Sequence, residues 1–97
     1  MLIKTLSGIG IGGAKTHTEK DAVAVIKQGT TVQVIFEFTC MLLPGTYFMN
    51  AGCSAKSGGE RINLHRILDA CMFRVCEERA LRATGIVDFN VTSDVID

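Results

Sequence analysis

The residues of this chain that could carry chemistry begin with a glycine-rich stretch near the N-terminus. Gly8, Gly10 and Gly13 match the spacing G-x-G-x-x-G, which wraps a dinucleotide pyrophosphate where a strand joins a helix. No amphipathic helix pattern follows Gly13, and the acidic residue nearest to the required position, Glu37, falls in a different predicted strand. The stretch therefore favours a β-hairpin or a β-bulge over a cofactor site.

A second near match to a nucleotide site overlaps the first. Gly12-Gly13-Ala14-Lys15-Thr16 resembles the phosphate-binding loop, which needs a glycine directly before its lysine so that the backbone can wrap a phosphate. Ala14 holds that place here. We therefore expect no nucleotide and no other cofactor.

The cysteines do not have the spacing of a metal site. A structural zinc site usually combines a C-x₂₋₄-C pair with a second close pair of ligands. Cys71 and Cys76 are five positions apart, but Cys40 and Cys53 are thirteen apart and form no second pair. Their apolar neighbours favour a role as small core side chains for three of them, Cys40, Cys53 and Cys71. We expect no bound metal.

His65, Arg66 and Asp69 form the most polar cluster within an apolar context. His65 and Asp69 would face each other on a helical turn, since residues four apart do so. No nucleophile with a local signature accompanies them, so we expect a binding protein and not an enzyme. A structural ion pair or a capped turn is the favoured role, and a ligand-facing polar patch is the alternative.

The elements that would position these residues are mostly strands. In residues 31–38 every second side chain is apolar (Val32, Val34, Phe36 and Phe38), which gives one strongly apolar face. After the Pro44-Gly45 turn signal, residues 46–53 also read as a strand, with Tyr47, Met49, Ala51 and Cys53 on one face. This turn would make the two strands an antiparallel pair or pass the chain between two sheets. Shorter strands are predicted at 2–6, 72–75 and 86–91.

Residues 60–82 carry a conflicting signal. Apolar residues recur at intervals of three and four, and neither glycine nor proline interrupts the stretch. Periodicity alone predicts one amphipathic helix here.

Composition limits the class of protein. The chain has 97 residues, which is one domain at most, and its formal net charge is zero, so we expect no nucleic acid and no anionic membrane as partner. Its apolar fraction of 47% exceeds what one small monomer easily buries, so we expect a homo-oligomer. With neither a signal peptide nor a membrane-spanning run in the sequence, we expect a cytoplasmic location and no direct membrane insertion.

Five short motifs along the chain belong together: Ile3-Lys4-Thr5, Leu42-Leu43-Pro44-Gly45-Thr46-Tyr47-Phe48-Met49-Asn50-Ala51-Gly52, Leu64-His65-Arg66-Ile67-Leu68-Asp69-Ala70, Met72-Phe73-Arg74-Val75 and Gly85-Ile86-Val87-Asp88-Phe89. As a set they resemble a known family, the C-terminal domain of Wzt-type ATP-binding subunits of O-antigen ABC transporters. The resemblance implies an immunoglobulin-like antiparallel β-sandwich, with one short helical turn around 62–70 and a strand at 72–75. The first strands of the family domain have no counterpart, so residues 1–97 would form a single partial domain, which oligomerisation, with an exchanged strand, could complete.

The resemblance also implies a function, which is recognition of the exported polysaccharide without catalysis. Polar residues of the matching motifs, together with one ring that could stack on a sugar, make up the expected ligand-binding set: Tyr47, Asn50, His65, Arg66 and Asp69. The alternative function is that of an oligomeric structural or protein-interaction domain that no longer binds glycan.

Overall fold

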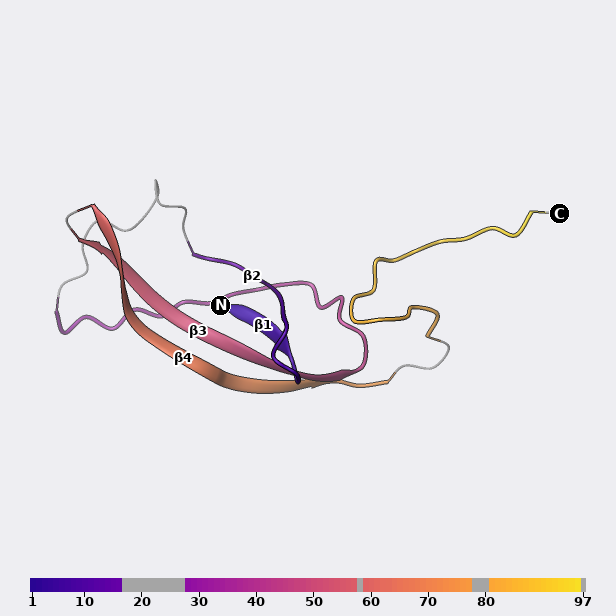
Figure 1. Ribbon diagram of the computed structural model, residues 1–97, viewed down its shortest axis with the longest axis horizontal. Coiled ribbons are helices and arrows are strands. Elements are labelled where there is room, and N and C mark those ends of the chain that lie inside the picture. Colours follow the sequence, from indigo (N-terminus) through magenta and orange to yellow (C-terminus); the bar gives the residue numbers. More distant parts are fainter. Residues whose placement is uncertain (17–27, 58, 78–80, 97) are drawn as a thin grey trace.

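The computed structural model describes residues 1–16, 28–57, 59–77 and 81–96, and four strands within these ranges form one open antiparallel sheet. Its strands are β1 (Leu2–Thr5), β2 (Gly10–Gly13), β3 (Gly45–Ser57) and β4 (Glu60–Val75), in the spatial order β2-β1-β3-β4 (Figure 1). The described ranges contain no helix, and therefore none that could cross a membrane. The expectation of a mostly β protein is confirmed. The described strands form a single sheet layer.

The glycine-rich stretch forms the hairpin between β1 and β2, as the sequence favoured. The N–H of Thr5 donates to the carbonyl of Ile9 (2.9 Å) and the N–H of Gly8 to the carbonyl of Thr5 (3.0 Å). Gly8 has a φ of 93°, a left-handed conformation that glycine adopts without steric cost. The register shifts between Ile3 and Lys4, so the hairpin also contains a β-bulge.

Two neighbouring glycines of β2 provide a matched test of this hairpin. A Cβ added at Gly13 would overlap the carbonyl oxygen of Met1, whereas one added at Gly12 meets no atom within 4 Å. We expect Gly13→Ala to lower the free energy of unfolding by about 1–3 kcal/mol, because backbone must move, and Gly12→Ala to change it by less than about 0.5 kcal/mol. Urea denaturation of both variants measures the difference, and equal effects would contradict the observed pairing of Met1 with β2.

The long β3–β4 hairpin dominates the sheet. The strand predicted at 46–53 is confirmed within β3, and the strand at 72–75 is the end of β4. The helix predicted by periodicity for 60–82 and the short helical turn around 62–70 are both wrong, because residues 60–75 pair along β3 from Ser57↔Glu60 to Gly45↔Val75. Pairing with a neighbouring strand overrides a weak local helix preference.

The strand predicted at 31–38 is not formed. The alternation is present, but β3 has β1 and β4 as its two neighbours, so the expected pairing of 31–38 with 46–53 has no free strand edge. The predicted strand at 86–91 is reduced to one bridge, Leu42↔Val87. Two hydrogen bonds flank this bridge, from the N–H of Leu43 to the carbonyl of Ile86 (2.8 Å) and from the N–H of Asp88 to the carbonyl of Met41 (2.6 Å).

The core of the molecule is small. Only Ile3, Leu43 and Tyr47 are buried hydrophobic residues in the described part of the chain. The three cysteines expected in the core, Cys40, Cys53 and Cys71, are exposed, since a single sheet has no second layer to cover them. The radius of gyration is 18.2 Å, against about 12.5 Å for a compact domain of this length, and the molecule is elongated (Figure 1). The chain therefore leaves much apolar surface uncovered.

Candidate functional site

A wide irregularity in β4 creates the polar centre of the sheet. Met49 pairs with Cys71 and Ala51 pairs with Ile67, so residues 68–70 of β4 all lie opposite Asn50. Asp69 within this bulge has a φ of 52°, and aspartate tolerates the left-handed region better than most residues. The backbone N–H of Asp69 donates to Oδ1 of Asn50 at 2.9 Å. Two residues of the predicted set are thus in direct contact.

Lys4 completes this polar centre from the other side of β3. Its Nζ lies 2.8 Å from Oδ1 of Asp69. Because β3 separates β1 from β4, the Lys4 side chain must cross β3 to reach Asp69. Sequence reasoning missed Lys4, since nothing in the sequence links a residue of the first strand to one more than sixty positions later.

The Lys4–Asp69 ion pair is expected to stabilise the fold only slightly. The Asp69 side chain is 51% exposed and that of Lys4 is 18% exposed, so water and salt screen the pair. We expect Lys4→Met to lower the free energy of unfolding by about 0.5 kcal/mol at low salt and by less at high salt. Thermal melts at both salt concentrations test this, with the exposed Lys15→Met as control. A loss that salt does not change would contradict an electrostatic origin.

Phe48 supplies an aromatic ring beside the polar centre. In the ladder it lies opposite Lys4 of β1 and Met72 of β4, and it is half-buried. Phe48 stands two residues before Asn50 in a strand, so the two side chains share one face. The alternation of 46–53 contained this signal, but the sequence analysis selected the neighbouring Tyr47.

Tyr47 lies on the opposite face and belongs to the core. Its side chain is 5% exposed, its hydroxyl donates to the carbonyl of Leu43, and its ring stacks on Phe73 with centroids 5.6 Å apart. Phe73 is also its direct cross-strand partner. In the structure the Tyr47 side chain therefore packs in the core.

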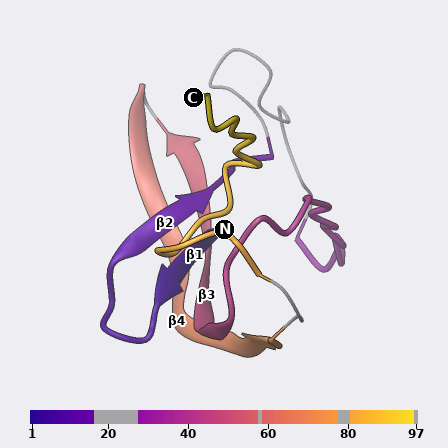
Figure 2. The same ribbon diagram turned by 90° about the vertical axis from the view of Figure 1, so that its right-hand side faces the viewer.

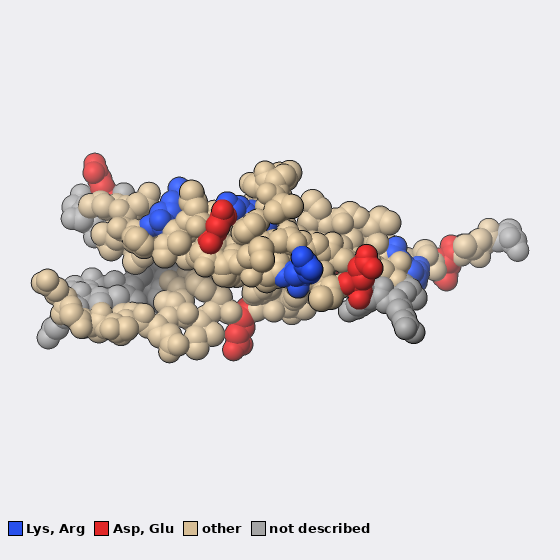
Figure 3. Space-filling model, turned by 90° about the horizontal axis from the view of Figure 1, so that it is seen from below, with Lys and Arg blue, Asp and Glu red and all other residues tan. Residues whose placement is uncertain are grey.

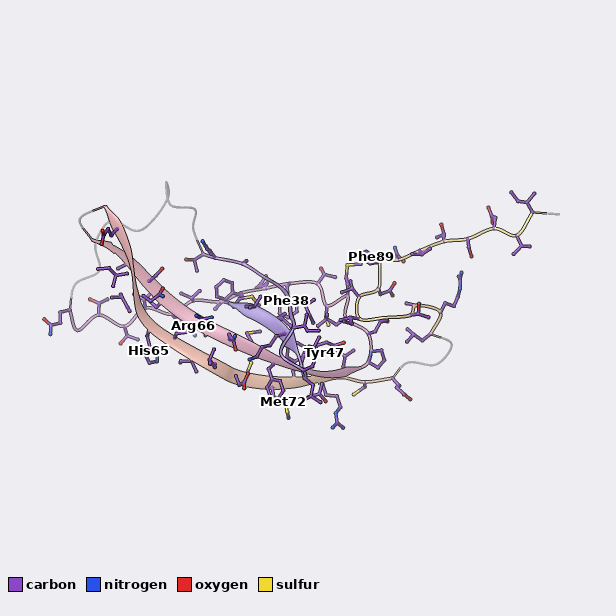
Figure 4. The ribbon with its side chains drawn as sticks, viewed as in Figure 1. Phe38, Tyr47, His65, Arg66, Met72 and Phe89 are labelled. Atoms are coloured by element: carbon purple, nitrogen blue, oxygen red, sulfur yellow. The ribbon has the colours of Figure 1, made fainter. Side chains whose placement is uncertain are left out.

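His65 and Arg66 lie further along β4, toward the β3–β4 turn and away from Tyr47 and Met72 (Figure 4). Arg66 pairs with Gly52, which follows Asn50 on the same side of β3, whereas His65 pairs with Cys53 on the other side. Both side chains are exposed. The ion partner of Asp69 is Lys4, not the His65 that a helical turn would have provided. Asn50, Asp69 and Arg66 therefore share a side of the ladder.

The charges around this face are mixed in sign. Met72 projects below the sheet in Figure 4, and Figure 3 views the molecule from that side. Lys and Arg side chains alternate there with Asp and Glu along the length of the molecule. Among the described residues, this face offers charged groups of both signs and no continuous patch of one sign.

The comparisons with known proteins give one match. Residues 1–89 of this chain match the family model described as the Wzt C-terminal domain. No curated protein matches the chain, and no solved structure does. The match covers most of the 97 residues and all four strands.

Proposed function

Because the chain belongs to the Wzt C-terminal domain family, we propose that it is a non-catalytic carbohydrate-binding module that recognises an O-antigen-like polysaccharide in the cytoplasm. One observation carries the proposal: the Asp69 bulge holds a carboxylate and the Asn50 amide side by side on an exposed sheet face. Carboxylates and amides hydrogen-bond vicinal sugar hydroxyls. Here the backbone N–H of Asp69 holds the Asn50 amide and Lys4 holds the Asp69 carboxylate, so both groups are oriented before any ligand arrives.

The surroundings of the bulge fit the two kinds of surface that a sugar presents. The Phe48 ring offers an apolar face for the C–H patches of a pyranose, and Arg66 adds a planar donor further along the same side. We place Asn50, Asp69 and Arg66 in direct contact with the glycan, together with Phe48 and Lys4. His65 extends the site around the edge of β4, and Tyr47 supports it by packing on the opposite face of the sheet.

A binding panel tests this proposal. The chain is immobilised and exposed to bacterial O-polysaccharides, with dextran as an unrelated polymer. We expect saturable binding to at least one O-polysaccharide and none to dextran. The binding should need no added metal or cofactor, and the glycan should be recovered unchanged. Equal, non-saturating signals from all polymers would contradict a specific site.

The open sheet favours a second candidate, an oligomeric protein-interaction domain that binds no glycan. Twenty large hydrophobic side chains are exposed in the described part of the chain, Val34, Ile35 and Met72 among them. Such a surface is typical of a subunit contact. A homo-oligomer that binds none of the polysaccharides would favour this candidate over the first.

A further inference from the structure

Residues 31–39 have the sequence of a strand but no strand partner among the described residues. They belong to no strand of the structure, and no backbone hydrogen bond joins them to another described residue. The apolar side chains Val32, Val34 and Phe38 are each more than half exposed. Figure 2 shows this segment, in magenta, set apart from the sheet, and Figure 4 places Phe38 on the side of the sheet opposite to Met72.

The sequence of this segment is self-complementary about Ile35. If two copies pair antiparallel with Ile35 opposite Ile35, every pair has favourable chemistry: Val34 with Phe36, Val32 with Phe38, Gln33 with Glu37, and Thr31 with Thr39. Aromatic and β-branched residues stabilise one another when they lie directly opposite on a sheet. Glu37 faces an amide and not a second carboxylate, so no like charges oppose each other.

We propose that residues 31–39 of two copies of this chain pair in this register. The two strands then form a layer over the face of each sheet that lies opposite to Met72. The surface of the molecule supports a second copy as the occupant. The chain exposes 8634 Å², about 3,200 Å² more than a compact protein of its mass. A stable dimer needs only about 600–1,000 Å² from each partner.

The edge of β4 is a poorer place for a second copy. Its bulge at 68–70, with Asp69 in a left-handed conformation, breaks the row of backbone groups that another strand would need. Bulges of this kind protect sheet edges from pairing. The unpaired, regular segment around Ile35 has no such interruption.

Cysteine cross-linking tests the register. In a background in which the four exposed cysteines are serine, Ile35→Cys places two thiols directly opposite, at about 4.5–5.5 Å between Cα atoms, within reach of a disulfide. Thr31→Cys places them about 27 Å apart. We expect mild oxidation to give a covalent dimer for Ile35→Cys and not for Thr31→Cys. Dimer formation by both, or by neither, would overturn the register.

A charge exchange tests the same pairing without cysteine. Gln33→Glu sets a carboxylate opposite Glu37 twice per dimer, and we expect the dissociation constant in analytical ultracentrifugation to rise about tenfold. The double variant Gln33→Glu with Glu37→Gln restores the amide–carboxylate pairs and should return it to within about threefold of the parent. Gln28→Glu, outside the segment, controls for net charge. A parent protein that stays monomeric at micromolar concentration, or a double variant no tighter than the single, would refute the proposal.

Discussion

Replacing Tyr47 with alanine is expected to lower the free energy of unfolding by about 3–5 kcal/mol. Tyr47 is one of the three buried hydrophobic residues in the described part of the chain, and the change removes its stacking on Phe73. A single domain is stable by only about 5–15 kcal/mol, so this variant should be largely unfolded at 37 °C. Circular dichroism during urea denaturation measures the loss.

The Tyr47→Phe variant measures the contribution of the hydroxyl separately from that of the ring. The ring and its contact with Phe73 remain, and only the hydrogen bond to the carbonyl of Leu43 is lost, which should cost about 1 kcal/mol. Because the side chain lies on the face of the sheet opposite to Asn50, polysaccharide affinity should change less than about threefold. A Tyr47→Phe protein of parental stability that no longer binds glycan would instead place this hydroxyl in the ligand site.

Replacing Asn50 with alanine is expected to weaken polysaccharide binding about 10-fold to 100-fold. The change removes an amide from the face and also releases the backbone N–H of Asp69, so the bulge backbone that carries the carboxylate loses its hydrogen bond to β3. Binding is measured by isothermal titration calorimetry on variants that show the parental melting temperature within a few degrees.

Asn63→Ala is the matched control for this change. Asn63 is an exposed asparagine of the same hairpin, but it pairs with Ser54 near the β3–β4 turn and lies away from the bulge. We expect its affinity to stay within about threefold of the parent. If both variants lose binding equally, the bulge is not the centre of the site.

Asp69→Asn examines the charge of the bulge alone. Asparagine keeps the tolerance for a positive φ, so the backbone should hold its shape, while the ion pair with Lys4 is lost. We expect glycan affinity to fall at least about fivefold with a stability change under about 1 kcal/mol. Isothermal titration calorimetry measures the affinity of this variant as well. An unchanged affinity would mean that the carboxylate does not contact the ligand.

Much of the sheet could be predicted from the sequence, because alternation identifies strands whose two faces differ. The strands around Ile3 and Met49 were found in this way, and the glycine stretch gave the first hairpin. Alternation does not identify a partner strand, which is why residues 31–38 were wrongly assigned to the sheet. The helix predicted for 60–82 failed for the converse reason, since the partner strand β3 decides the conformation and is not visible in a local window.

The candidate site could be predicted in part. The motifs of the family pointed to Asn50 and Asp69, which the structure brings into contact. Lys4 could not be found, because its contact depends on which strand lies between β1 and β4. Phe48 could have been found, since it shares the face of Asn50 by simple alternation, and Tyr47 occupies the other face for the same reason.

A two-dimensional amide NMR titration with a panel of bacterial O-polysaccharides tests the central claim most directly. The account predicts saturable shifts that cluster on Phe48, Asn50, Arg66 and Asp69 for at least one polysaccharide, with the amide of Asp69 among the largest because its N–H is held by Asn50. A well-dispersed spectrum that no polysaccharide perturbs, or shifts confined to residues 31–39, would contradict a glycan site at the bulge.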